Sequence, residues 1–106
     1  MTGDATLNFG GLQQQLNGFA FVADEDTGFP LLTVLGSYAH VLDLTDMALT
    51  LEAAKPVEVR QTLLHAPDAT VVGPFATVGG LGSGAKLRYR EHDVGYSVGG
   101  ILMIVR

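Results

Sequence analysis

The chain has 106 residues, a mass of 11.1 kDa and a formal net charge of −5. Its length limits it to a single domain, residues 1–106, with a modest core, and its lack of cysteine excludes disulfides, thiolate metal sites and a cysteine nucleophile. Only 16% of the residues are charged, against roughly 25% in ordinary soluble domains, while 47% are hydrophobic. This composition argues against disorder and suggests a surface that other subunits cover.

The two halves of the chain differ in charge. Residues 1–54 contain seven acids and no lysine or arginine, whereas residues 55–106 contain four acids and six of these bases. If the halves interleave in one sheet, the asymmetry disappears on folding. If they do not, the molecule has opposed faces that can steer head-to-tail association.

Alternating apolar and polar residues, interrupted by glycine, proline, asparagine and aspartate, predict strands along most of the chain. Leu12 and Leu16 lie four residues apart and predict one short helical turn before Gly18. No internal repeat is visible. The pattern predicts an all-β fold, a single small barrel or sandwich of about seven to nine short strands, largely antiparallel. The expected strands lie near residues 6–9, 19–23, 31–42, 47–52, 57–64, 70–72, 75–78, 86–92 and 94–105.

The first long turn contains the triplet Asp26-Thr27-Gly28, and a glycine-rich stretch, GGLGSGAKLRYRE, follows later. Together they resemble the active-site triplet and the flap of retroviral-type aspartic proteases. The resemblance implies a homodimeric enzyme in which two copies of Asp26 share a proton. The residues before the triplet are acidic rather than apolar, so an exposed acidic turn is the alternative.

Three histidines and three tyrosines are the other candidate polar groups. Tyr38, His40 and Tyr96 could be polar groups in an apolar ligand pocket. His40 shares an apolar strand face with Tyr38, which predicts a core histidine bonded to a backbone carbonyl. No two histidines have the spacing that would preform a metal site on one element, so we expect no metal and no other cofactor.

Residues 80–85, GLGSGA, satisfy the G-x-G-x-x-G/A pattern of dinucleotide-binding folds. Such a site needs a helix directly after the glycines, yet the next residues, KLRYREHD, alternate with period two. We therefore expect a glycine-rich hairpin loop between two strands, and no nucleotide.

Four potential cations alternate with other residues in the stretch after this loop, which would place all four on one strand face. That face is either an interface for an acidic partner, such as the N-terminal half of a neighbouring subunit, or the solvated outer face of an edge strand. A nucleic-acid partner is not expected, because the net charge is negative and the stripe is short. The candidate interface residues here are Lys86, Arg88, Tyr89, Arg90 and His92.

The chain ends in GGILMIVR, in which Ile101, Met103 and Val105 alternate with further apolar residues. A strand that is apolar on both faces must be packed on both sides or paired across a subunit boundary. These three residues are therefore further interface candidates. The run is far too short for a membrane span and the N-terminus shows no signal peptide, so we expect no membrane partner and a cytoplasmic or virion location.

Taken together, these patterns predict a non-enzymatic structural module that assembles with copies of itself or with other subunits, for example in a viral capsid- or tail-type assembly. The alternative is a small-ligand-binding β-barrel, and a more distant one is the protease-like enzyme that would use Asp26. We assign no catalytic residue, because no acid–base constellation is evident.

Overall fold

The structure is a computed structural model that describes residues 1–13, 16–82 and 84–98. The described residues form strands and a single 3-10 turn, which confirms the all-β prediction. Among them no helix has the length and apolarity needed to cross a membrane. The elements are β1 (Ala5–Asn8), β2 (Gly18–Val22), β3 (Leu32–Leu35), η1 (Tyr38–His40), β4 (Val41–Asp43), β5 (Ala48–Glu52), β6 (Gln61–His65), β7 (Thr70–Val72), β8 (Thr77–Gly79), β9 (Ala85–Tyr89) and β10 (Asp93–Val98).

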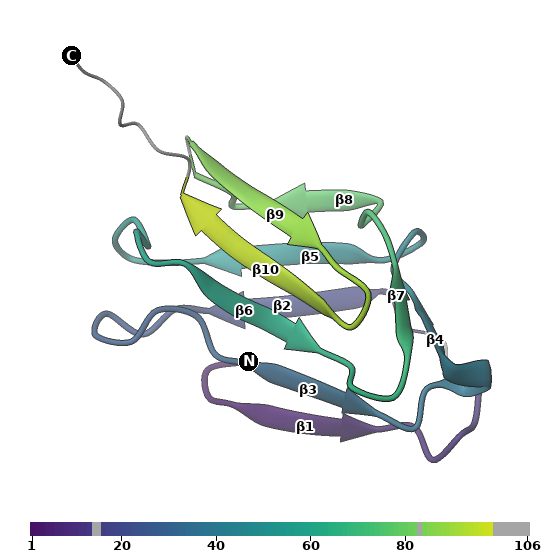
Figure 1. The fold of residues 1–106 in the computed structure, drawn as a ribbon. Coiled ribbons are helices and arrows are strands. Elements are labelled where there is room, and N and C mark those ends of the chain that lie inside the picture. Colours follow the sequence, from purple (N-terminus) through teal and green to yellow (C-terminus); the bar gives the residue numbers. More distant parts are fainter. Residues whose placement is uncertain (14–15, 83, 99–106) are drawn as a thin grey trace.

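Three sheets form the sides of the molecule (Figure 1). The five-stranded sheet has the order β1-β3-β6-β10-β9, and the three-stranded sheet β2-β5-β8 lies behind it. The two-stranded sheet β4-β7 lies along one side. The chain visits the three sheets in the same sequence twice, as β2-β3-β4 and then as β5-β6-β7. We call these passages coil 1 (residues 18–47) and coil 2 (residues 48–76), and coil 3 (residues 77–98) ends in the β9-β10 hairpin.

Successive coils stack in parallel register. Gly18 lies opposite Ala48, which lies opposite Thr77, and Val41 lies opposite Thr70. Within the described residues five strand pairs are parallel, and two, β10 with β6 and with β9, are antiparallel. The prediction of a largely antiparallel fold was therefore wrong. Parallel neighbours require a long crossover, and the rest of each coil supplies it by passing through the other two sheets.

The prediction offered a barrel or a sandwich, and the barrel alternative is wrong, because no sheet formed by the described residues closes into a barrel. The strand predicted over residues 31–42 is in fact two strands. Gly36, Ala39 and His40 have φ values of +65°, +55° and +58°, which interrupt the extended backbone between β3 and β4. The helical turn predicted before Gly18 is not found in its described residues, 11–13 and 16–18.

The core lies between the three sheets and takes side chains from each of them. Val34, Leu64 and Val94 of the five-stranded sheet are completely or almost completely buried, and so are Phe21 and Leu49 of the three-stranded sheet. Each such side chain contributes roughly 1.5–3 kcal/mol by leaving water. Inward residues alternate with exposed ones, as in β5, where Leu49 and Leu51 are buried and the residues that follow each are exposed.

Because the coils stack in chain order, the position of a residue in the sequence determines its position along the stack. In all three sheets the strand order runs from early strands to late ones, except that β10 precedes β9. Residues 1–47 hold six acids and no lysine or arginine, whereas coil 3 holds three such bases and two acids. The acidic and basic halves thus do not interleave, and the charge asymmetry of the sequence persists in space.

Candidate functional site: a basic face on the five-stranded sheet

The period-two pattern of β9 is confirmed. Ala85, Leu87 and Tyr89 are half-buried toward the core, while Lys86 and Arg88 are exposed on the outer face. Because β9 is the last strand of its sheet, one of its backbone edges has no partner strand among the described residues.

The strand is shorter than predicted. The N–H of Arg90 donates to the carbonyl of Asp93 at 2.9 Å, which closes a hairpin turn, so β9 ends at Tyr89. His92 lies in this turn, where its Nδ1 is 2.7 Å from the carbonyl oxygen of Ala69. His92 therefore does not extend the stripe of β9 and instead links the turn to coil 2.

Neighbouring strands add residues to this outer face. Val94 and Tyr96 of β10 are buried in the core, and the alternation of the strand places Asp93, Gly95 and Ser97 on the same face as the stripe, although Ser97 is only 6% exposed there. Gly95 lies between Arg88 on β9 and Thr62 on β6, and Ser97 lies opposite Lys86. A hollow of about 200 Å³ opens here, lined by Arg60, Gln61, Thr62, Arg88, Arg90, Gly95, Tyr96 and Ser97.

Arg60 was not singled out from the sequence. It precedes β6 and is separated from Arg88 by most of coil 2 and the glycine-rich loop, so only the antiparallel pairing of β6 with β10 brings it to this face. No local pattern signals its role. We call Arg60, Lys86, Arg88 and Arg90 the basic face.

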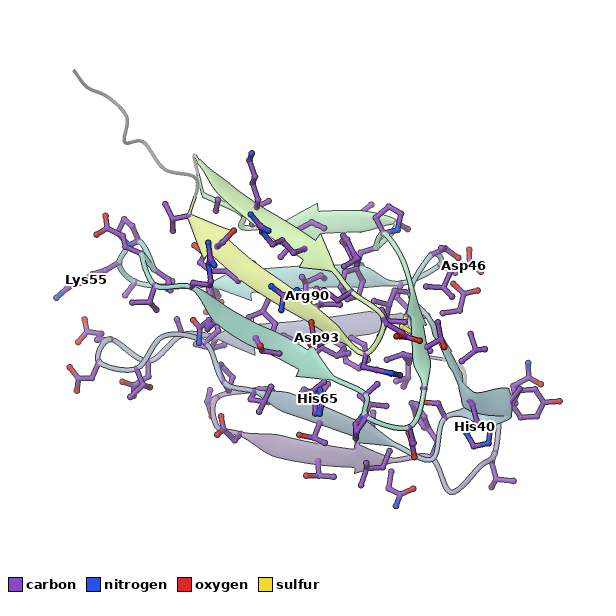
Figure 2. The ribbon with its side chains drawn as sticks, in the orientation of Figure 1. His40, Asp46, Lys55, His65, Arg90 and Asp93 are labelled. Atoms are coloured by element: carbon purple, nitrogen blue, oxygen red, sulfur yellow. The ribbon has the colours of Figure 1, made fainter. Side chains whose placement is uncertain are left out.

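The basic face is poorly neutralised. Arg90 Nε lies 3.9 Å from Asp93 Oδ1, with the arginine side chain 58% exposed, so this pair is weak (Figure 2). Among the described residues no carboxylate lies within 4.0 Å of a side-chain nitrogen of Arg60, Lys86 or Arg88. The face therefore carries an excess of positive charge.

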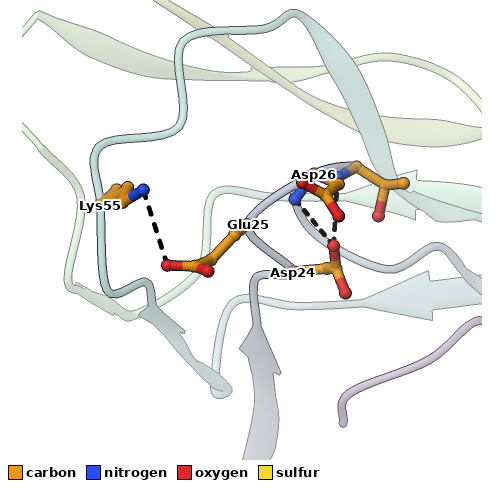
Figure 3. A network of polar contacts seen from close by, with 5 residues as sticks. Asp24, Glu25, Asp26 and Lys55 are labelled. Atoms are coloured by element: carbon orange, nitrogen blue, oxygen red, sulfur yellow. Dashed lines mark hydrogen bonds and ion pairs between the residues drawn. The ribbon is translucent and has the colours of Figure 1, made fainter.

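Coil 1 carries an acidic turn between β2 and β3 (Figure 3). Asp24 Oδ1 accepts hydrogen bonds from the N–H groups of Asp26, at 2.8 Å, and Thr27, at 3.3 Å. The Glu25 carboxylate is 3.7 Å from the Lys55 ammonium, and both side chains are more than half exposed. Asp26, the aspartate of the protease-like triplet, is exposed in this turn, which is the acidic surface turn that the sequence offered as the alternative.

The three predicted pocket residues do not meet. Tyr38 and His40 are exposed on η1, whereas Tyr96 is buried in the core and its hydroxyl donates to the carbonyl of Val57 at 2.7 Å. His40 Nδ1 is 3.1 Å from the carbonyl oxygen of Asp68, so its backbone partner is as predicted although its side chain is not in the core. The hydroxyl of Tyr89, a candidate interface residue, accepts from the N–H of Phe75 at 3.2 Å.

A larger apolar groove, of about 580 Å³, lies beside the glycine-rich loop between β8 and β9. Phe29, Leu51, Val57, Tyr96 and Val98 are among its walls. The loop connects β8 to β9, which lie in different sheets, so it is not the hairpin loop that was predicted. Its first glycine, Gly80, has a φ of +82°.

Ile101, Met103 and Val105 lie outside the described residues. Within the described part of the chain, no group of three histidine, aspartate or glutamate side chains is arranged to hold a metal ion. His65 lies opposite Asp93 on the outer face, far from the exposed η1 that carries His40 (Figure 2).

Comparison of the chain with protein-family models, with curated proteins and with solved structures finds no match.

Proposed function

We propose that the protein is a non-enzymatic structural module that associates head to tail with copies of itself, or with another subunit that presents a similar surface. The observation that supports this most is the polarity of the stack, in which the strand order places coil 2 between the acidic first coil and the basic last hairpin. Opposite charges on opposite ends attract neighbouring copies in one orientation and repel them in the other two.

The backbone offers a second reason. Among the described residues the five-stranded sheet ends in β1 at the coil 1 side and in β9 at the coil 3 side, and an unpaired strand edge is a template for another chain. Two different edges make a heterologous contact, which gives a ring if the rotation between copies closes and a filament if it does not.

We propose that this association forms part of a multi-subunit assembly of the viral capsid or tail type, in the cytoplasm or in a virion. The low fraction of charged residues supports such a role, because 16% leaves little of the surface strongly hydrated. Partners would be copies of the chain or other assembly subunits.

The native mass in solution tests the proposal. Light scattering at micromolar concentration should give a multimer at low salt whose mass falls as salt is raised, because contacts between exposed charges are screened beyond about 8–10 Å at physiological ionic strength. A stable monomer at every salt concentration would contradict head-to-tail association.

The second candidate function is binding of a small apolar ligand, and the groove of about 580 Å³ favours it. Only Tyr96 of the three predicted pocket residues lines this groove, so the ligand would lie against Phe29 and Leu51 rather than inside a barrel. A fluorescent hydrophobic probe should bind with a defined stoichiometry, and an added small apolar molecule that fits the groove should displace it. The protease-like activity at Asp26 is the third, and it would require two exposed acidic turns to meet.

A further inference from the structure

Gly95 occupies the centre of the basic face, and nothing in the backbone requires a glycine there. Its φ lies outside the left-handed region, and a Cβ built on it would meet only the carbonyl oxygen of Gln61, at an ordinary 3.7 Å. The register shift beside it places the extra residue, Leu63, on β6 and not on β10. A glycine in a strand interior weakens the strand by roughly 0.5–1 kcal/mol relative to alanine.

Such a glycine often marks a place where a ligand or another backbone approaches closely. Gly95 lines the hollow of about 200 Å³ on the outer face, and there it presents backbone and no side chain. This volume corresponds to several water molecules, each of which takes up about 30 Å³ in liquid water. The hollow is therefore large enough for a small anionic group.

The groups around the hollow are suited to an oxyanion. Arg60, Arg88 and Arg90 each carry a planar guanidinium with five N–H donors, and this group matches phosphate and carboxylate oxygens in pairs. Thr62, which is exposed, and Ser97, which is only 6% exposed, also line the hollow and carry hydroxyl groups. Asp93 lies beside Arg90, and its Oδ1 is buried with no hydrogen-bond partner among the described residues. Arg60 and Arg88 have no carboxylate within 4.0 Å in the described part of the chain.

We propose that this hollow is a binding site for a phosphate-type oxyanion, with Gly95 as its floor and Arg60, Arg88 and Arg90 as its charged walls. Three guanidinium groups match a dianion with several oxygens better than they match a single carboxylate, which has one charge and two oxygens. The proposed association would bring an acidic turn of a neighbouring copy onto this same face, so a small anion binds the hollow when the protein is dilute and the face is open.

A titration of dilute protein with inorganic phosphate, at ionic strength held constant with sodium chloride, tests the site. Two-dimensional amide NMR should show saturable shifts at Thr62, Gly95 and Ser97. Arg88→Gln should weaken binding roughly tenfold or more, the effect of losing one charge-assisted hydrogen bond. Lys55→Gln, which removes an exposed cation elsewhere, is the matched control and should bind as the wild type does.

Gly95→Thr separates the ligand role from the structural one. Its side chain has room on the outer face and suits a strand, so the variant should fold with a melting temperature equal to or above that of the wild type. It should nevertheless lose phosphate binding, because the side chain fills the hollow.

Two results would overturn the proposal. One is phosphate binding that Arg88→Gln and Gly95→Thr leave unchanged, or shifts that chloride alone reproduces. The other is acetate binding as tight as phosphate binding, which would mean that the face recognises carboxylates, such as those of an acidic turn, rather than a phosphate-type anion.

Discussion

The side-chain amide of Gln61 makes both hydrogen bonds to Phe29 that a neighbouring strand would make. Gln61 Oε1 accepts from the Phe29 N–H at 2.9 Å, and Nε2 donates to the Phe29 carbonyl, also at 2.9 Å. Phe29 is only 6% exposed, so its backbone groups have little access to water. One side chain of coil 2 thus replaces a missing rung of the parallel ladder and links the turn of coil 1 to the next coil.

Gln61→Ala should lower the free energy of unfolding by about 2 kcal/mol, because it leaves two poorly hydrated backbone groups of Phe29 without partners. Urea unfolding followed by circular dichroism measures this change. Gln13→Ala, at an exposed glutamine, is the control and should change stability by less than about 0.5 kcal/mol. Equal effects of the two substitutions would show that the Gln61 bonds do not stabilise the stack.

The glycine-rich loop should be sensitive at one glycine and tolerant at another. A Cβ at Gly80 would lie 1.8 Å from the carbonyl oxygen of Leu51, and its φ is +82°. Gly80→Ala should therefore destabilise the fold by more than about 2 kcal/mol. Gly82→Ala meets no heavy atom within 4 Å and should be neutral or slightly stabilising. Thermal unfolding of both variants checks this, and a tolerated Gly80→Ala would contradict the close approach.

Ionisation of the Tyr96 hydroxyl should lower the stability of the protein at high pH. Burial, and secondarily the charge of Glu58, raise the pKa of Tyr96 above its ordinary value of 10.0. A raised pKa means that the folded state holds the Tyr96 proton more tightly than the unfolded state does. The stabilisation that protonated Tyr96 provides is therefore complete below about pH 10 and is lost as the pH rises through the folded-state pKa.

Tyr96→Phe isolates this effect. The variant should lose about 1 kcal/mol at neutral pH, because the bond to the Val57 carbonyl is gone, but its stability should fall less steeply above pH 10. Urea unfolding at a series of alkaline pH values gives the slope of the unfolding free energy against pH for the wild type and for the variant. Parallel curves for the two proteins would contradict the role of Tyr96.

Asp43 should have the opposite pH dependence. Hydrogen bonds from the Thr45 hydroxyl, at 2.6 Å, and from the Thr45 N–H, at 2.9 Å, lower the pKa of Asp43 below its ordinary value of 3.8. Its stabilising effect is complete above that value and is lost as the pH falls through the lower, folded-state pKa. Asp43→Asn should therefore show a shallower loss of stability below pH 3.8 in acid titrations monitored by circular dichroism.

The strands could be predicted from the sequence, but their partners could not. Alternation locates β5 and β9 because each has one buried face. The pairing joins residues far apart, namely Phe21 with Leu51, Leu32 with Leu64, and Leu42 with Val71, at separations of 30, 32 and 29 residues. No sequence pattern within a single strand indicates how far along the chain its partner strand lies.

The repeat of the coils is invisible in the sequence for a related reason. What recurs is an apolar residue at each inward position, and its identity changes from coil to coil, as when Phe21 is followed by Leu51. The unequal separations also prevent a simple alignment of one coil with the next. The stripe of Lys86 and Arg88 was predicted correctly, whereas Arg60 and Gly95 join that face only through the pairing of β6, β10 and β9.

The most direct test of head-to-tail association uses two neutralised variants, one at each end of the stack. Glu25→Gln with Asp26→Asn removes two negative charges from the acidic turn, and Arg88→Gln with Arg90→Gln removes two positive charges from the basic face. Each variant alone keeps only one working end, so sedimentation at low salt should show a monomer in both cases. Their equimolar mixture should give a one-to-one dimer that grows no further. Large assemblies of either variant alone, or a mixture that stays monomeric, would contradict the account.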